Sequence, residues 1–335
     1  MNRALPIILL ILIFLIVALP SMLARSCRPP AVERPPAVDR TPIESPAGEI
    51  TLNVFNHHTN QSDDISLEEY LVGVVAAEMP ASFELEALKA QAIVARTYTV
   101  TQMRSYGGKG CDKHPGSPDI CTDHTHCQAW ESEEKSLGKW DAAEAPENLN
   151  KIRQAVRETA GQVIHHNGLT IDAVFHAHCG GHTENSEDVW SAALPYLRAV
   201  DCPYCAGTRW SKTEHSFTGS EFAQAMLPYV SAVPVSASGR PLIDAPVRTA
   251  TGRIKTLTIA GESIGGRDIR AALRLPSTNF TWQIDGDTIT FTNRGYGHGV
   301  GLCQYGADGM AKAGKTYEEI IHHFYTGVNL IPLSP

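Results

Sequence analysis

Glu78 is a carboxyl group in an apolar setting, near the end of a predicted helix. It follows Leu71, Val74 and Val75 at the spacing i, i+3, i+4, i+7, which places the four side chains on one face. A carboxyl group among apolar side chains has a raised pKa and stays protonated near neutral pH, as a general acid requires. The alternative is a helix-end glutamate that reaches water or pairs with Arg96 on the next helix. The pattern alone leaves both interpretations open.

A second group of reactive residues lies in the segment 111–127, which is rich in cysteine and histidine. Thiolate and imidazole groups together are typical zinc ligands. The spacings match no standard zinc finger, and a Cys121–Cys127 disulfide is the alternative outside the cytoplasm. The candidate ligands in this segment are Cys111, His114, Cys121, His124, His126 and Cys127.

Helices and strands must position these residues. SLEEYLVGVVAAEMP is a predicted helix, with Ser66 and Glu69 at capping-box spacing and Pro80 as its stop. A second helix is expected from about Ser82 through LEALKAQAIVARTYTVTQM, and TYEEIIHHFY is a capped helix near the end. ITLNVFNHH predicts an opening strand, and two hairpins are expected, at Asn167-Gly168 and within FTWQIDGDTITF. Without regular βαβ alternation, this order indicates the α+β class.

The N-terminal segment predicts a membrane anchor. ALPIILLILIFLIVALPSMLA carries no charge and is long enough to span a bilayer, although a cleaved signal peptide is the competing interpretation. We assign residues 1–27 to a transmembrane anchor, 28–47 to a Pro-rich linker and 48–332 to the folded region, with a second subdomain within about 206–293. This organisation predicts a single-pass protein of the cell membrane whose folded region lies on the extracytoplasmic side. The formal net charge of -8 argues against nucleic acid as a partner.

Four long segments resemble the signature segments of the stage II sporulation protein D family: EYLVGVVAAEMPASFELEALKAQAIVARTY, CTDHTHCQAW, GGHTENSEDVW and RGYGHGVGLCQYGADGMAKAGKTYEEII. The resemblance implies the fold of that family and a peptidoglycan lytic transglycosylase. Such an enzyme cuts glycan strands, preferentially peptide-stripped ones, between MurNAc and GlcNAc and leaves 1,6-anhydro-MurNAc ends. It further implies a role in forespore engulfment during sporulation, with an amidase and a membrane protein as partners.

The resemblance also implies roles for individual residues. The catalytic glutamate of the family corresponds to Glu78, which would protonate the glycosidic oxygen and then take the proton of the attacking C6 hydroxyl. Intramolecular attack of this kind is worth about 7–11 kcal/mol and replaces the second carboxylate of ordinary glycosidases. Zinc would be bound by His114, Cys121 and Cys127, mainly to fix the loop beside the cleft. The substrate-binding candidates by motif match are Gln128, Thr183, Glu184, Gln304 and Tyr305.

Four further cysteines mark a departure from the resembled family. Cys179 and Cys303 stand where that family commonly carries serine, and Cys202 and Cys205 form the sequence CPYC. Because the resemblance places their segments beside one cleft, we expect all four to cluster in space. Two disulfides and a second zinc site are both compatible with that cluster.

Two other functions have to be weighed. A non-catalytic wall-binding activator of an N-acetylmuramoyl-L-alanine amidase would keep the cleft but would not need an acidic residue at position 78. A zinc hydrolase would need an open metal position beside a general base, and the sequence contains no H-E-x-x-H pattern. Glu78 therefore favours the glycan-cleaving enzyme.

Overall fold

The computed structural model describes residues 37–230 and 243–334. The predicted transmembrane anchor, residues 1–27, and most of the predicted linker lie outside the described residues. Within those described ranges, no helix has both the length and the apolar character needed to cross a membrane. The described end of the linker lies against the folded region: Ile43 is buried, and Asp39 accepts a hydrogen bond from Arg157 at 2.8 Å.

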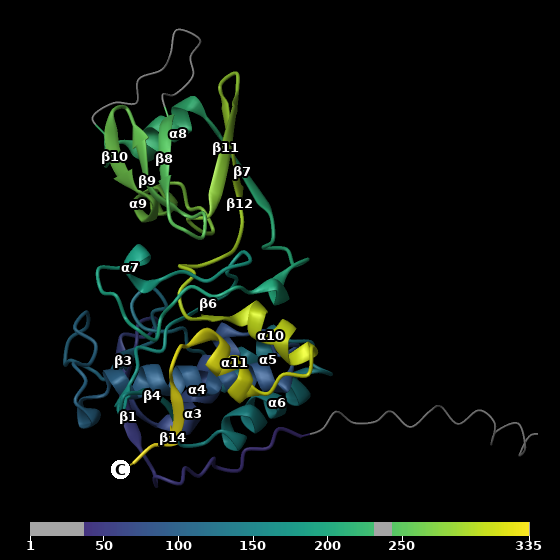
Figure 1. The fold of residues 1–335 in the computed structure, drawn as a ribbon. Coiled ribbons are helices and arrows are strands. Elements are labelled where there is room, and N and C mark those ends of the chain that lie inside the picture. Colours follow the sequence, from purple (N-terminus) through teal and green to yellow (C-terminus); the bar gives the residue numbers. More distant parts are fainter. Residues whose placement is uncertain (1–36, 231–242, 335) are drawn as a thin grey trace, which may run out of the picture. The chain divides into compact units, whose positions relative to one another are not determined.

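Residues Val38–Pro335 form one compact unit of mixed helices and small sheets, and the predicted α+β class is confirmed (Figure 1). Its helices are α3 (Leu67–Glu78), α4 (Leu85–Gln102), α5 (Glu133–Lys139), α6 (Ala145–Glu158), α7 (Ser186–Val189), α8 (Gly219–Met226), α9 (Gly266–Ala272), α10 (Gln304–Lys312) and α11 (Tyr317–Phe324), with 3-10 turns η2 (Arg104–Tyr106) and η3 (Pro203–Cys205). Its strands are β1 (Thr51–Asn56), β2 (Gln61–Ser66), β3 (Ile120–Cys121), β4 (Gln162–His166), β5 (Leu169–Thr170), β6 (Phe175–His176), β7 (Thr213–Thr218), β8 (Ile243–Arg248), β9 (Ile254–Ile259), β10 (Glu262–Gly265), β11 (Phe280–Asp285), β12 (Thr288–Asn293), β13 (Leu302–Cys303) and β14 (Asn329–Pro332).

The sheets are small and connect distant parts of the chain. β1 pairs antiparallel with β2 and parallel with β3, and β4 lies between β14 and β5. β6 and β13 form a two-stranded parallel pair, in which Cys303 lies opposite His176. Both predicted hairpins are confirmed: β4 and β5 flank Asn167-Gly168, and β11 pairs with β12. The parallel β6–β13 pair brings the C-terminal part of the chain to the segment that follows residue 175.

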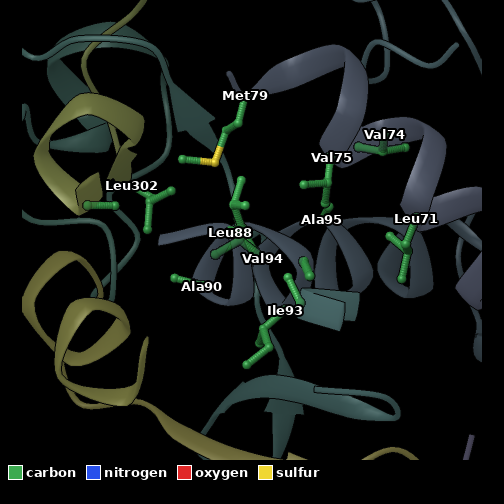
Figure 2. Close-up of a cluster of buried hydrophobic side chains, with 14 of the residues drawn as sticks. Leu71, Val74, Val75, Met79, Leu88, Ala90, Ile93, Val94, Ala95 and Leu302 are labelled. Atoms are coloured by element: carbon green, nitrogen blue, oxygen red, sulfur yellow. The ribbon is translucent and has the colours of Figure 1, made fainter. Parts of the chain in front are cut away.

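Helix α4 lies at the centre of the main hydrophobic core. It packs against α3, α6, α10 and α11, and alanines on several of its sides are fully buried, which lets the neighbouring helices approach closely. Figure 2 shows Leu71 and Val75 of α3, Ile93 of α4 and Leu302 of β13 within this cluster. The same core holds one buried ion pair, between Arg96 and Glu68.

The helix boundaries follow part of the predicted signals. α3 starts directly after Ser66 and ends at Glu78, before Pro80. The predicted capping box at this helix is wrong, because the Ser66 side chain makes no capping hydrogen bond and Glu69 instead pairs with Arg153 at 2.7 Å. The cap of the last helix is confirmed, since α11 begins with a complete Thr316–Glu319 capping box.

A second hydrophobic cluster lies in the segment that contains β7 to β12. Phe222 of α8, Leu257 of β9 and Phe291 of β12 are fully buried in it. The three-stranded sheets β10-β9-β8 and β11-β12-β7 supply its apolar faces, and α8 and α9 pack against them. The alternating burial of β12 is typical of a strand with one face in a core.

Candidate active site and metal centre

Glu78 is the last residue of α3, and its carboxyl group meets the loop that follows the cysteine-rich segment. The backbone N–H of Ala129 donates a hydrogen bond to Oε1 of Glu78 at 2.7 Å. The side chain is partly buried. The alternative pairing with Arg96 is wrong, because Nη2 of Arg96 lies 2.6 Å from the carboxylate of Glu68. Among the described residues, Glu78 thus accepts a hydrogen bond from a backbone N–H and forms no ion pair with a lysine or arginine.

The surroundings of Glu78 raise the pKa of its carboxyl group above the ordinary glutamate value. Burial is the main cause, because it penalises the charged form. The Ala129 N–H, the charge of His124 and the amide of Gln304 act in the opposite direction but do not cancel the effect of burial. The protonated carboxyl group thus persists to higher pH than that of an exposed glutamate, as a general acid requires.

Glu78 lines a cavity of about 520 Å³. The walls come from α3, α4, the loop 124–127, β6 with the residues after it, Trp190, the segment 296–298 and Gln304. Of the described residues that line this cavity, Glu78 alone carries a carboxyl group. The arrangement provides one acid with no second carboxylate positioned to act as nucleophile or to activate water.

The glycine-rich segment that closes one side of the cavity depends on close backbone approach. Gly301 has φ +70°, and a Cβ atom there would lie 2.1 Å from the carbonyl oxygen of Val174. Only glycine can adopt this conformation at such a distance without displacing the neighbouring backbone. The contact brings the segment 296–301 against β6 and orients His298, whose Nε2 lies 2.8 Å from the Phe175 carbonyl oxygen.

The predicted substrate-binding residues lie in different places. Gln304 lines the Glu78 cavity. Gln128 is buried and donates a hydrogen bond to Oγ1 of Thr99 at 2.7 Å, so its amide faces the core. Thr183 is also buried and accepts a hydrogen bond from the backbone N–H of Val200. These two side chains hold backbone segments together in this structure.

Tyr305 and Glu184 complete the predicted set. The ring of Tyr305 packs edge-on against Phe83 at 5.0 Å. Glu184 accepts hydrogen bonds from Thr249 at 2.7 Å and Thr251 at 2.5 Å, and it lines a second cavity of about 680 Å³. That cavity shares Thr125, Trp190 and His298 with the Glu78 cavity, so the two adjoin.

Two cavity residues were not singled out from the sequence. Trp190 and His298 line the Glu78 cavity, and each lies inside one of the signature segments; His124, a candidate ligand from sequence, lines the cavity as well. Their place in these segments could have indicated a role at the site. In a glycine-rich or turn-rich stretch, no helix or strand periodicity assigns an aromatic ring or imidazole to the hydrophobic core. Trp190 and His298 contact each other, with ring centroids 5.1 Å apart.

The cysteine-rich segment forms a compact ligand cluster from Cys111, Cys121, His126 and Cys127. One ligating atom of each lies within 4.8 Å of all the others. Nδ1 of His126 is 3.3 Å from the Cys111 sulfur and 3.4 Å from the Cys127 sulfur. Hydrogen bonding with Cys127 is the largest cause that lowers the pKa of Cys121, to about 4. A Cys₃His set of this kind fits a closed, four-coordinate zinc site.

The imidazole of this cluster is also oriented as zinc ligands commonly are. Nε2 of His126 lies 3.3 Å from a carboxylate oxygen of Asp112. A carboxylate on the outer nitrogen fixes the tautomer and leaves Nδ1 free to ligate. Asp112 thus supports the interpretation of His126 as a ligand.

The structural cluster differs from the predicted ligand set His114, Cys121 and Cys127. His114 is not among the clustered atoms: its ring stacks on Phe55 at 4.1 Å. Cys111 and His126 take part instead. His126 and Cys127 also line the Glu78 cavity, so the cluster forms part of its wall.

The expected proximity of Cys179, Cys202, Cys205 and Cys303 is confirmed. Their sulfur atoms all lie within 4.8 Å of one another, and all four residues are buried. Among the described residues, none of the cysteines is joined in a disulfide.

Comparison with known proteins gives consistent similarities. A family model described as stage II sporulation protein matches residues 55–166. The chain is 38% identical over 284 residues to the stage II sporulation protein D of Bacillus subtilis (strain 168), covering 85% of this chain and 80% of that protein. It is 36% identical over 288 residues to the protein of the same name from Bacillus amyloliquefaciens, covering 86% and 79%. A weaker similarity, 29% over 308 residues, is to the amidase enhancer of B. subtilis (strain 168), covering 78% of this chain and 40% of that protein.

Proposed function

The chain belongs to the stage II sporulation protein D family, and from this premise we propose that it is a lytic transglycosylase of peptidoglycan. It would cut glycan strands between MurNAc and GlcNAc and leave 1,6-anhydro-MurNAc ends. The observation that carries the proposal is Glu78: one carboxyl group of raised pKa in a cavity of about 520 Å³.

The chemistry needs only one protein carboxyl group. Protonated Glu78 donates its proton to the glycosidic oxygen as the bond to the anomeric carbon breaks. The resulting carboxylate, stabilised by the Ala129 N–H, then accepts the proton of the C6 hydroxyl as that oxygen attacks the same carbon. The nucleophile belongs to the substrate, which agrees with the lack of a second carboxyl group among the described lining residues.

The adjoining cavity supports peptide-stripped strands as the substrate. Its lining carries four basic and three acidic side chains: Arg253, Lys255, Arg267 and Arg270, and Glu184, Asp188 and Asp268. Removal of the stem peptide at its lactyl amide frees a carboxylate on the muramic sugar, and guanidinium groups suit the planar geometry of a carboxylate. We propose that sugars next to the cleaved bond lie in this cavity.

We further propose that the Cys111, Cys121, His126 and Cys127 cluster binds zinc. The metal would tie the loop 124–127 to β3 and so hold one wall of the Glu78 cavity. With four protein ligands it is closed, and its chemistry is structural: it cross-links the loop and leaves acid–base work to Glu78.

A pair of histidine variants tests this ligand set. His126→Ala is expected to lower the zinc content by about one ion per chain and to lower Tm, because metal binding is coupled to folding of the loop. The matched variant His114→Ala should retain the metal, since His114 lies outside the cluster. Elemental analysis of the zinc content of both full-length variants shows which histidine is the ligand. Loss of zinc from His114→Ala alone would restore the ligand set predicted from sequence, and a mapped Cys121–Cys127 disulfide would exclude the site.

Product analysis across pH tests the proposed activity. Full-length protein incubated with peptide-stripped strands should yield anhydromuramic ends, detected by mass spectrometry. Because Glu78 must be protonated to act first, kcat/KM should fall as pH rises through its pKa, and burial places this fall above the ordinary value for glutamate. Reducing ends without the anhydro form would indicate hydrolysis and contradict the proposal.

The biological setting follows as a further proposal. We assign the protein to forespore engulfment, anchored in the cell membrane with its folded region outside, and acting with an amidase and a membrane protein. The similarity to the amidase enhancer favours one alternative, a non-catalytic activator of an amidase. That alternative predicts stimulated peptide release without new anhydro ends, so the same product analysis separates the two functions.

A further inference from the structure

Cys179, Cys202, Cys205 and Cys303 form a compact group of sulfur atoms deep in the main core. Their exposed fractions are 0–1%. The sulfurs of Cys179 and Cys205 are 3.4 Å apart, and all four lie within 4.8 Å of one another. Four thiols gathered around one point, away from water, need an explanation beyond packing.

We propose that these four cysteines bind a single zinc ion as a structural tetrathiolate site, separate from the Cys₃His cluster. A zinc ion about 2.3 Å from each sulfur at the corners of a tetrahedron places the sulfurs about 3.8 Å from one another. The 3.4 Å between the sulfurs of Cys179 and Cys205, and the 4.8 Å limit within which all four sulfurs lie, are compatible with that value. Two disulfides would instead draw the sulfurs into two bonded pairs at about 2.05 Å.

The surrounding backbone is arranged as it is around metal-bound thiolates. The N–H groups of Cys179 and Gly306 each donate to the Cys303 sulfur at 3.2 Å, and the Gly181 N–H donates to the Cys179 sulfur at 3.4 Å. Such donors stabilise negative charge on sulfur and orient the ligands. These contacts are made by backbone groups of two separate chain segments.

A buried cation adds to this pattern. Nη2 of Arg253 donates to the Cys179 carbonyl oxygen at 2.6 Å, and its Nε and Nη1 atoms are buried without a hydrogen-bond partner within the described part of the chain. A zinc ion with four thiolates carries two negative charges. A neighbouring guanidinium offsets part of that charge in a medium of low dielectric constant.

Glycine at position 306 leaves room for the sulfur of Cys202. A Cβ atom at Gly306 would lie 2.5 Å from the Cys202 sulfur. Cys202 directly precedes the turn η3 and Cys205 is its last residue, and the two have the C-x-x-C spacing common in zinc sites. Cys202 and Cys205 also line a cavity of about 270 Å³.

The site has a consequence for the active centre. It would join three segments: the residues after β6, the turn η3, and β13 with the start of α10. Gln304 directly follows the ligand Cys303 and lines the Glu78 cavity. The metal would therefore fix the position of Gln304 without contacting substrate.

The experiment uses full-length protein with cysteines changed one cluster at a time. Wild type is expected to contain about two zinc ions per chain. Cys121→Ser, which breaks the other cluster, should retain about one, and its zinc X-ray absorption spectrum should fit four sulfurs at about 2.3 Å. The matched variant Cys205→Ser should lose that ion and keep the other.

One further measurement, on wild-type protein, keeps the proposal open to refutation if a variant does not fold. Alkylation of denatured wild type without reductant, followed by peptide mapping, should find all four cysteines as free thiols. Disulfide-linked peptides among these four would overturn the site. Iron in place of zinc would overturn the assignment of the metal, and a Cys121→Ser protein that is folded and metal-free would overturn the site itself. None of these outcomes depends on whether the protein cleaves glycan.

Discussion

Glu78→Gln is expected to lower the formation of anhydromuramic ends by about 10²–10⁴-fold, the usual range for loss of a general acid–base group. The amide has nearly the shape of the acid, so it fits the same partly buried place at the end of α3. Its N–H protons are too weakly acidic to be transferred to the glycosidic oxygen. The Ala129 N–H can still donate to the amide oxygen, so the fold and glycan binding should persist. The measurement is kcat/KM on peptide-stripped strands by mass spectrometry.

An exposed glutamate provides the matched control. Glu214 of β7 is paired with Lys212 at the surface, so Glu214→Gln removes the same charge away from the cavity. That control should cleave at the wild-type rate. Near wild-type cleavage by Glu78→Gln, with binding unchanged, would contradict the proposed mechanism. If the protein instead only activates an amidase, Glu78→Gln should leave amidase stimulation intact.

The position of Glu78 could be predicted because helix geometry is regular. A period of 3.6 residues places Glu78 on the stripe of Leu71, Val74 and Val75 whatever the rest of the chain does. The hairpin around Asn167-Gly168 was equally accessible, since Asn167 and Gly168 both have positive φ, as that turn requires. The capping box at Ser66 failed because Glu69 finds a stronger partner, Arg153, which lies 84 residues away.

The ligand loop could not be predicted in detail because it has no repeating geometry. The parallel pairing of β3 with β1 places Cys121 opposite Phe55, and a turn in which the Cys127 N–H donates to the Asp123 carbonyl oxygen returns Cys127 beside it. These long-range contacts select His126 for the cluster and direct His114 onto the ring of Phe55. Neither contact can be predicted from the spacing of these residues in the sequence.

The residues that face the cavity could be predicted only in part, for a related reason. Matching a segment predicts that it lies at the cleft, but not which of its side chains face the cavity. Gln128 turns toward Thr99 in the core, whereas His124, four residues earlier, lines the cavity. The direction of a loop side chain depends on its tertiary contacts, which cannot be predicted from a periodic sequence pattern.

Breaking the buried ion pair between Arg96 and Glu68 should strongly destabilise the fold. Arg96 is fully buried and Glu68 is 3% exposed. Arg96 donates to both carboxylate oxygens, and the Gly161 N–H donates to the carboxylate at 3.1 Å. Arg96 also donates to the Gln162 carbonyl oxygen, so the pair joins α3, α4 and β4. Because both groups are out of water, each depends on the other for the compensation of its charge.

Arg96→Met is expected to lower the free energy of unfolding by about 3–5 kcal/mol, because it leaves the Glu68 carboxylate buried without a cation. The double variant Arg96→Met, Glu68→Leu should recover part of this loss, since no charge then remains in the core. Lys315→Met breaks an exposed pair with Glu319 and should change stability far less, because water and salt screen that pair. Urea unfolding of the four proteins measures the differences. A double variant less stable than Arg96→Met would show that the hydrogen bond from the Gly161 N–H to Glu68 stabilises the fold more than the unpaired charge of Glu68 destabilises it.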